Sequence, residues 1–540
     1  MFVLRILIVA LFWLSAAVGV CAQENLLKNP GFEKGGASPV LNWHQVYPPS
    51  IQRPAPSFVR IEGKEHSFRA KEGKAFARIE TTQQGGFSSF TQSGSWKGSN
   101  NMLHLSSWVK VESVDARSAV YVIVLFIDAD GNQLSMEQTK RLTAACDWTL
   151  LEQEIVVPDG TAEWMVRCGV LGKASACFDD VKAIPSKMSG DATAVQLAVH
   201  HGDYVIRSAG SKKNAYVALS IPFPIARQVP LAIRVTTEPE GMVKELLITE
   251  DKENRPLRVV MNKMDAGSEV KLRVETLTMV ADRPLSKGEE IPLANPKKLP
   301  KGVKQHLKAA PGVDVKDKSI REAAASFSRD DFAAMMSDVQ KYLRANLQYE
   351  GGNSQGAVEC LDRGKAVCTG FANVAASLLI AADVPTRILA CTQLSGRLQE
   401  HYIVEAWTPE LGWSRMESTM AAFPWRDSGN LILRVVYPDS WRSQGDVPLF
   451  VEVSKGTSGG YRMDPKDTCW QGADMLTSAL LSGDDFEALA KAAGKSFQAM
   501  VKKPVDGSVA RMIPPSDSAK KLKLSKRGLK VLAAVDGWLD

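Results

Sequence analysis

The sequence predicts a multidomain protein in which two β domains precede a domain that mixes helices and strands. Three observations support this prediction. The chain has 540 residues, which suggests about three or four domains. Up to about residue 285, short segments alternate apolar and polar residues, as half-buried strands do. Beyond residue 318, apolar residues recur at helical spacing, and two further strand patterns follow them.

The composition is that of an ordinary globular protein, with 45% hydrophobic and 23% charged residues. The net charge of +6 is small for a chain of this length. It argues against nucleic acid as the main partner, because phosphate backbones are bound by strongly basic surfaces.

The first 22 residues have the three parts of a secretory signal peptide: a basic start with Arg5, an apolar run, and a small-residue end. We expect cleavage after Ala22. A lipoprotein signal through Cys21 is less consistent, because Val20 is larger than the residue that usually precedes a lipidated cysteine. No other stretch is apolar for long enough to span a bilayer. We therefore expect a secreted or periplasmic protein.

Residues 24–187 contain short alternating strands separated by turns, which is typical of a β-sandwich or jelly roll. The clearest strand patterns lie at 76–80, 103–110 and 119–124.

The two ends of this β domain resemble the carbohydrate-binding modules of families four and nine. Residues 25–33 (NLLKNPGFE) and 178–181 (FDDV) carry the resemblance, with comparable segments at 90–92 and 105–110. It implies a polysaccharide or other glycan as ligand. It also implies a structural calcium ion, for which Glu33 and Asp180 match by position. The rings that could stack on a sugar, and that we expect mainly in the core, are Trp43, Tyr47, Trp108 and Trp148.

Residues 190–285 predict a second β domain, which we interpret as an immunoglobulin-like spacer. Its alternating segments are short and are separated by Pro222, Pro224 and Pro230. Residues 286–317 are rich in proline and lysine and are expected to form a linker or surface loop.

A helix is predicted to start at 328–331, where Asp330 and Asp331 occupy the first turn. Its apolar face consists of Phe332, Met335, Val339, Leu343 and Leu347.

A second, more apolar helix is predicted to begin at Cys368. Its buried stripe consists of Phe371, Val374, Ala375, Leu378, Leu379 and Ala382. The positive end of a helix and its unpaired N–H groups favour the thiolate, which is the nucleophilic form of cysteine.

Only one of the seven histidines, His401, follows Cys368 in the chain. It opens an alternating strand, 401–407, and a turn at 409–412 leads into a second strand, 413–417. If the two strands pair as a hairpin, Glu417 lies beside His401. Glu417 would then orient the imidazole, and the imidazole would take the proton of the thiol.

These residues resemble the transglutaminase-like superfamily of papain-like folds over about residues 316–440. The shared motifs, in order, are Cys368-Thr369-Gly370-Phe371-Ala372, Val384-Pro385-Thr386-Arg387, His401 with Glu405, Gly412-Trp413, and Glu417-Ser418-Thr419. The resemblance implies an α+β catalytic domain over 318–440. It also implies that Cys368 is the nucleophile, His401 the base and Glu417 the orienting residue, with no cofactor for catalysis.

Two residues depart from the family pattern. Glu417 stands where the family usually has aspartate, and Ile403 stands where it frequently has tryptophan. For the oxyanion of the reaction, we expect a backbone N–H near Cys368 as donor rather than a side chain of Gln348 or Tyr349.

Seven cysteines remain once Cys21 is set aside. An odd set with one reserved thiol fits a cysteine enzyme in an oxidising compartment. Zinc is not expected at Cys368, His401 and Cys391, because their spacing differs from that of structural zinc sites. The two disulfides considered are Cys168–Cys177 and Cys360–Cys391, the alternative being that all these thiols stay reduced.

Residues 441–540 are expected to form a C-terminal extension with helices, the clearest at 484–501. The lysine-rich segment 517–539 is interpreted as a solvated helix face, with an anionic polymer as the alternative partner.

The leading hypothesis is a secreted thiol enzyme that cleaves or transfers an amide bond through a cysteine thioester. The first domain would hold it at a glycan surface, and its substrate would be a protein or peptide, cell-wall peptides included. Hydrolysis is favoured over transfer to an amine. The alternative is a non-catalytic glycan-binding or adhesion protein that retains the fold.

Overall fold

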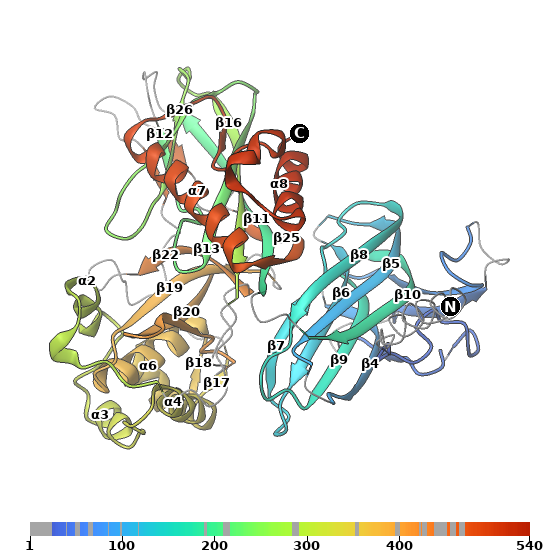
Figure 1. Cartoon of the computed structure of the whole chain (residues 1–540), viewed down its shortest axis with the longest axis horizontal. Helices are drawn as coiled ribbons and strands as arrows, with labels where there is room; N and C mark the ends of the chain where they lie inside the picture. Colours follow the sequence, from blue (N-terminus) through green and yellow to red (C-terminus); the bar gives the residue numbers. More distant parts are fainter. Residues whose placement is uncertain are drawn as a thin grey trace, which may run out of the picture. The chain divides into compact units, whose positions relative to one another are not determined.

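The computed structural model describes 17 segments of the chain, which form two compact units (Figure 1). The first unit spans residues 1–132 and 138–190, and the second spans 133–137 and 191–540. The expected signal peptide and Cys469 lie outside the described residues. The described segments are 24–38, 40–48, 55–62, 68–84, 86–97, 100–116, 118–187, 192–208, 216–282, 291–350, 356–394, 400–420, 423, 429–436, 451–453, 461–463 and 470–540.

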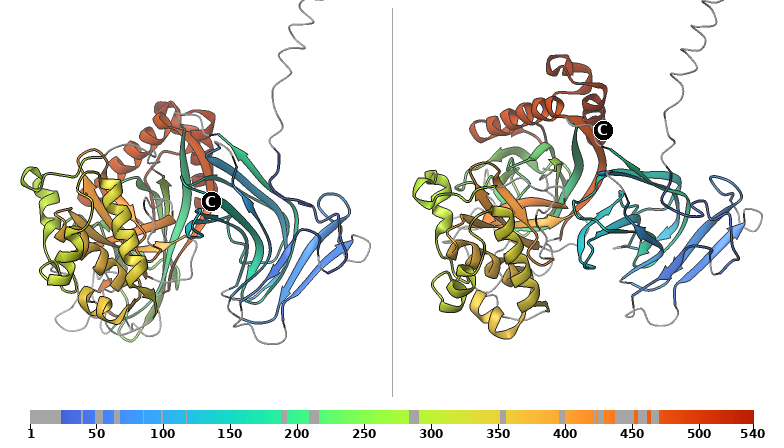
Figure 2. Two further views of the ribbon diagram at one scale, coloured as in Figure 1. Left: turned by 90° about the horizontal axis from the view of Figure 1, so that it is seen from below. Right: turned by 60° about the horizontal axis from the view of Figure 1, so that its bottom comes forward.

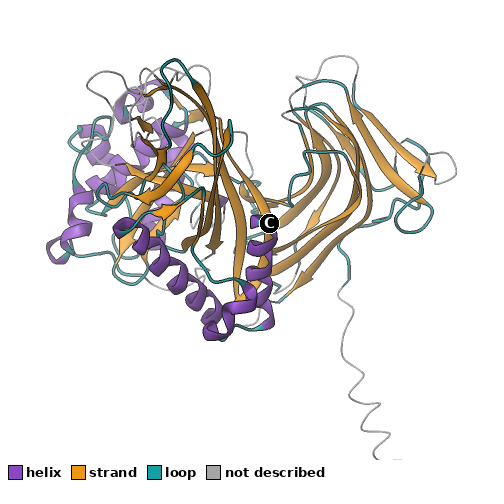
Figure 3. Ribbon diagram, turned by 90° about the horizontal axis from the view of Figure 1, so that it is seen from above, coloured by secondary structure: helices purple, strands orange, loops and turns teal. Residues whose placement is uncertain are grey.

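The first unit is a β-sandwich, and every described helix of the chain lies outside it (Figure 3). One sheet contains, in this order, β1 (His44–Val46), β4 (Phe87–Ser95), β9 (Glu163–Leu171) and β6 (Ala119–Ile127). The other has the order β2 (Ser57–Glu62), β3 (Ala75–Thr81), β10 (Ala174–Ser186), β5 (Met102–Val114) and β8 (Cys146–Val156).

The core of the sandwich follows from alternation along these strands. Val120, Val122 and Val124 of β6 are fully buried, as are Leu103 and Leu105 of β5. Because successive side chains of a strand point to opposite faces, one apolar set from each sheet fills the space between the two. The predicted sandwich is confirmed.

The second unit contains another sandwich, and its strands come from two distant parts of the chain (Figure 1, Figure 2). One sheet has the order β24 (Tyr461–Met463), β11 (Ala192–Ser208), β16 (Glu269–Ala281), β13 (Gln228–Glu238) and β27 (Val509–Arg511), with β25 (Trp470–Ser482) also paired to β11. The other has the order β23 (Val451–Val453), β12 (Tyr216–Leu219), β15 (Leu257–Met261), β14 (Val243–Ile248) and β26 (Val505–Asp506).

The range 190–285 therefore holds only part of the second β domain. Strand β25 lies antiparallel to β11 from Ala192↔Ser482 to Asp203↔Trp470. On its other side β11 pairs with β16. Without the strands that follow residue 450, both sheets would be incomplete, so the mixed domain is an insertion within this sandwich. The immunoglobulin-like identity stays a prediction.

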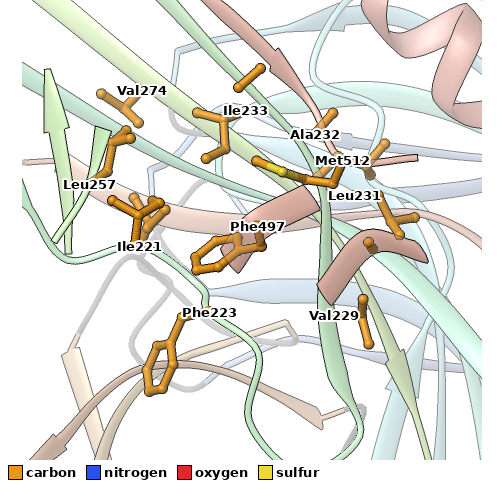
Figure 4. Close-up of a cluster of buried hydrophobic side chains, with 14 of the residues drawn as sticks. Ile221, Phe223, Val229, Leu231, Ala232, Ile233, Leu257, Val274, Phe497 and Met512 are labelled. Atoms are coloured by element: carbon orange, nitrogen blue, oxygen red, sulfur yellow. The ribbon is translucent and has the colours of Figure 1, made fainter. Parts of the chain in front are cut away.

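The predicted C-terminal helix is present as α7 (Gly483–Lys502), and the chain closes with η4 (Ser516–Leu522) and α8 (Lys526–Leu539). Ser482 caps α7 by accepting a hydrogen bond from the Asp485 N–H. The buried stripe of α7 covers β13 and β14, and Figure 4 shows Phe497 among the core side chains Ile221, Leu231, Ile233 and Leu257.

The mixed α+β domain is built around α6, whose residues from Thr369 to Ile380 are all buried. Helices α3, α4 and α5 contact it, and β19 and β20 cover another side. A four-stranded sheet has the order β21 (Gly412–Met416), β20 (Glu400–Thr408), β19 (Thr386–Gln393) and β22 (Asn430–Val436). The helices are η1 (Pro296–Lys298), α2 (Lys301–Lys304), η2 (Gln305–Leu307), α3 (Lys318–Ala325), α4 (Phe332–Asn346), α5 (Ala357–Arg363) and α6 (Cys368–Ala381).

Two sequence expectations about this domain can be compared directly with the structure. The helix expected from 328–331 is α4, and Asp331 caps it by accepting from the Ala334 N–H. The stretch expected as a linker is partly packed, since Ile291 and Val313 are buried in the core of this domain.

No disulfide joins the described cysteines. Cys168 and Cys177 are buried thiols, and burial holds the pKa of both far above the ordinary value. Cys391 is also a thiol, and its Sγ donates to the His401 carbonyl at 3.4 Å. Neither of the two considered disulfides is therefore formed in this structure.

Candidate active site

Cys368 is the first residue of α6, as the helical spacing predicts. Helix α5 ends at Gly364, whose φ of 65° lies in the left-handed region that favours glycine. The short strand β18 (Lys365–Ala366) then leads to Val367, which precedes the helix in an extended conformation and makes no side-chain cap. The thiol and the N–H of Cys368 thus stand at the open end of a buried helix.

His401 and Glu417 come together through the predicted hairpin. Strands β20 and β21 pair antiparallel, with Val404 opposite Met416. Glu417 follows β21 directly, and its Oε2 lies 2.7 Å from His401 Nε2. Both side chains are buried, Glu417 completely. Because Nε2 is engaged by Glu417, Nδ1 is the ring nitrogen left to face Cys368.

The pKa of His401 is raised to about 10. Burial acts to lower it, but the charge on Glu417 and hydrogen bonds to Cys368 and Glu417 outweigh that effect. An imidazolium at neutral pH is the natural partner of a thiolate. The structure thus brings together the three residues Cys368, His401 and Glu417 in the order thiol, imidazole, carboxylate.

A buried ionic network lies on the same strand as the histidine. Glu405 is completely buried and follows His401 by four residues on β20, so both point to one face. Its Oε2 pairs with Arg387 Nη2 at 2.6 Å, and its Oε1 accepts from Arg415 Nε at 3.1 Å. These two arginines lower the pKa of Glu405, although burial acts to raise it. The network fixes β19, β20 and β21 to one another.

The network extends to the second β domain. Arg387 Nη1 lies 2.5 Å from Glu253 Oε2, and the Arg387 guanidinium lies 4.1 Å from the centre of the Trp413 ring. His306 packs edge-on against the same ring at 5.1 Å. Arg387 and Glu405 belong to the sequence motifs of the domain, whereas no motif indicates Glu253. Glu253 and Arg387 are 134 positions apart in the sequence, so no local pattern indicates their contact.

The four rings that could stack on a sugar differ in how exposed they are. Trp43 is buried in the core, as expected, whereas Tyr47 is 43% exposed and stacks on Phe58. Trp108 of β5 and Trp148 of β8 are half-buried, and the Lys71 Nζ lies 4.0 Å from the centre of the Trp108 ring.

The carboxylates expected to bind calcium already have protein partners. Glu33 Oε1 accepts from the N–H groups of Lys74 and Ala75, and Asp180 Oδ2 lies 2.5 Å from Lys182 Nζ. The Lys182 ammonium occupies the Asp180 oxygen that a cation would use. Calcium at Glu33 and Asp180 stays a prediction that requires Lys182 to leave Asp180.

Within the part of the chain that the structure describes, no group of three or more His, Cys, Asp or Glu side chains is arranged to hold a metal ion. None of the described helices combines the length and the apolar character needed to cross a membrane.

Residues 320–418 match the family model described as Transglutaminase-like superfamily, so the chain contains a transglutaminase-like domain. The match includes Cys368, His401 and Glu417. No curated protein matches the chain.

Several solved structures are similar to parts of the chain. One is described as a candidate cysteine protease from Cytophaga hutchinsonii, with 13% identity over 53% of this chain and 99% of that one, at a TM-score of 0.37. Two are carbohydrate-binding modules. The xylan-binding domain from Paenibacillus barcinonensis has 15% identity over 29% of this chain and 93% of that one, with a TM-score of 0.22. The family 11 carbohydrate-binding module from Clostridium thermocellum has 13% identity over 32% of this chain and 99% of that one, with a TM-score of 0.21.

Proposed function

We propose that this protein is a thiol enzyme that cleaves or transfers an amide bond through a thioester on Cys368. The observation that carries the proposal is the 2.7 Å contact of His401 Nε2 with the buried Glu417, beside a cysteine that opens a buried helix. A thiol, an imidazole and an orienting carboxylate are the groups that nucleophilic acyl transfer requires.

In the first step, the Cys368 sulfur attacks the carbonyl carbon, and the carbonyl π pair moves to oxygen. His401 holds the proton that left the thiol. When the tetrahedral intermediate collapses, the C–N bond breaks and the leaving amine takes that proton. A thioester remains on Cys368. In the second step, an acceptor attacks the thioester, His401 removes the acceptor's proton, and the thiolate is released.

We infer that the acceptor is water rather than a lysine amine. The Cys368 side chain is half-buried, and the neighbouring Tyr349 is 60% exposed. A transferase has to keep water away from its thioester, whereas a hydrolase does not. The substrate class we propose is a protein or peptide, with cell-wall peptides included.

We also propose that the protein acts outside the cytoplasm and is held at a glycan surface by its first unit. The proposal is supported by the signal-like residues 1–22 and by the motif resemblance of 25–33 and 178–181 to carbohydrate-binding modules. The rings of Trp108 and Trp148 on the sandwich are half-buried, so part of each reaches the surface. Pull-down of the full chain on insoluble glycans tests this part independently of catalysis.

The enzymatic proposal is tested by incubating the full chain with peptide substrates and reading masses. Hydrolysis of a peptide bond adds the mass of one water to the summed products. Transfer to an added primary amine gives an acyl product that has gained the amine and lost the group the amine replaces, which is ammonia or the leaving peptide. Both changes should disappear in Cys368→Ala. If the wild type and Cys368→Ala give the same masses on every substrate, the alternative of a non-catalytic glycan-binding protein stands. The departures at Glu417 and Ile403 are the observations that favour that alternative.

A further inference from the structure

Tyr349 is brought to the nucleophile by a two-residue parallel strand pair. Strand β17 (Gln348–Tyr349) lies beside β18, with Tyr349 opposite Ala366. The Gln348 N–H donates to the Gly364 carbonyl at 2.9 Å, and the Glu350 N–H donates to the Ala366 carbonyl at 3.0 Å. Because Ala366 is two residues before Cys368, this pairing fixes the backbone of Tyr349 next to the start of α6.

The ring of Tyr349 lies over the first turn of that helix. It stacks on Phe371, with the ring centres 6.1 Å apart and an angle of 28° between the planes. Phe371 follows Cys368 by three residues on α6, so the two occupy neighbouring positions on the helix surface. Phe371 is only 3% exposed and gives the Tyr349 ring a fixed platform. Gln348, the adjacent residue of the strand, points to the opposite face.

The phenol oxygen is next to the reacting groups. The pKa of Tyr349 is raised, first by burial and then by the charge on Cys368, while a hydrogen bond from the Cys368 backbone N–H acts to lower it. The charge on Glu417 contributes to the rise as well. The stack on Phe371 and the strand pairing place the Tyr349 ring beside the start of α6, although the residue as a whole is 60% exposed.

The Cys368 N–H is the expected donor to the oxyanion, because the first N–H groups of a helix have no intrahelical partner. An oxyanion is stabilised best by two donors at about 2.7–3.1 Å. The stack on Phe371 holds the Tyr349 phenol at this end of the helix, which is where the carbonyl oxygen has to arrive. The phenol also carries an O–H group that can donate to an oxyanion.

We propose that Tyr349 supplies the second oxyanion donor, with its hydroxyl turning from the Cys368 N–H to the carbonyl oxygen when substrate takes over that N–H. This inference rests on the proposed thiol chemistry. The sulfur–carbon bond forms, the π pair moves to oxygen, and the Tyr349 O–H donates to that oxygen without losing its proton. On collapse the π bond re-forms, the leaving group departs, and the hydroxyl returns to the Cys368 N–H.

The test compares two electrophiles on the same thiol. Iodoacetamide reacts at a saturated carbon and forms no oxyanion, whereas p-nitrophenyl acetate acylates through one. Tyr349→Phe keeps the ring on Phe371 and removes only the hydroxyl. In the full chain, we expect alkylation of this variant within about twofold of wild type and acylation slower by about 10²- to 10³-fold. Rates are read by mass at the Cys368 peptide, with Cys368→Ala as background.

Tyr342→Phe is the matched control, because Tyr342 lies in α4 and packs edge-on against Phe327. Both of its rates should equal those of the wild type. Acylation of Tyr349→Phe at the wild-type rate or faster would overturn the inference. A faster rate would mean that the hydroxyl only blocks the Cys368 N–H. An equal loss of both rates would overturn it too, by placing the effect on the thiol. A wild type that neither alkylates readily nor acylates removes the proposed function itself, a result distinct from these.

Discussion

Glu417 holds His401 with one carboxylate oxygen and is itself held by the other. Its Oε2 lies 2.7 Å from His401 Nε2, while its Oε1 accepts from the Thr419 N–H at 3.1 Å and from the Thr419 hydroxyl at 2.6 Å. The longer side chain therefore reaches the imidazole in a fixed orientation. Glutamate at this position is compatible with the orienting role that aspartate usually has.

Substitution of Glu417 tests that role. Glu417→Gln keeps the size but loses the charge, and we expect acylation of Cys368 to slow by about 10²- to 10⁴-fold. Glu417→Asp keeps the charge but shortens the reach, so we expect an intermediate loss. Acylation by p-nitrophenyl acetate is the measurement. An aspartate variant as fast as the wild type would show that the 2.7 Å contact does not matter.

The reactivity of Cys368 should depend on His401. In the wild type, we expect iodoacetamide to label Cys368 rapidly at pH 6, well below the pH at which an ordinary thiol ionises, about 8.5. The reason is that the raised pKa of His401 favours the imidazolium beside a thiolate. In His401→Ala, labelling at pH 6 should fall at least about tenfold. Equal pH profiles for the two proteins, read by mass spectrometry, would contradict the ion pair.

The same raised pKa has a consequence for stability. Cys368→Ser is the suitable background, since it removes the thiol, and we expect Glu417 alone to outweigh the effect of burial on the pKa of His401. The folded protein then binds more protons than the unfolded chain above pH 6.5, the ordinary histidine value. The contribution of His401 to stability is complete below pH 6.5 and falls by up to about 1.4 kcal/mol per pH unit as the pH rises toward the pKa of His401 in the folded variant.

Urea unfolding between pH 6 and 10 measures this dependence, with Cys368→Ser/His401→Gln as the reference protein. The difference in the free energy of unfolding between the two should shrink as the pH rises. Parallel curves would mean that Glu417 does not raise the pKa of His401.

The buried network around Glu405 is expected to stabilise the domain, because Glu405 pairs with two buried arginines. Glu405→Ala leaves Arg387 and Arg415 buried without this acceptor, and we expect a loss of roughly 3–5 kcal/mol in the free energy of unfolding. Glu410→Ala, in the exposed turn between β20 and β21, is the matched control and should change stability by less than about 0.5 kcal/mol. Equal midpoints for the two variants in urea would contradict a structural role of the network.

Local patterns were sufficient to predict the elements that carry the site. The apolar stripe from Phe371 to Leu379 predicted α6 and its start at Cys368, because the buried face of a helix places apolar residues at a regular helical spacing. The alternation after His401, with a turn at Gly412, gave the β20–β21 hairpin and the approach of Glu417.

Long-range partners could not be predicted in this way. Strand β25 pairs with β11 from nearly 300 positions further along the chain, so nothing close to β11 signals its second neighbour. The contact of Glu253 with Arg387 is hidden for the same reason. Gln348 and Tyr349 are neighbours in the sequence, and the stack of Tyr349 on Phe371 shows which of the two lies over the start of α6.

Because the transglutaminase-like domain is inserted in the second sandwich, that sandwich can be completed only after the inserted domain has been synthesised. Strand β11 is made early, yet the strand that covers one side of it from Ala192 to Asp203 is made only after the whole inserted domain. Until then that edge offers a long row of unsatisfied N–H and C=O groups, which is a template for aggregation. A chain interrupted before Trp470 would therefore leave this edge of β11 exposed and prone to aggregate, so the segment that begins at Trp470 is needed to protect a strand made much earlier.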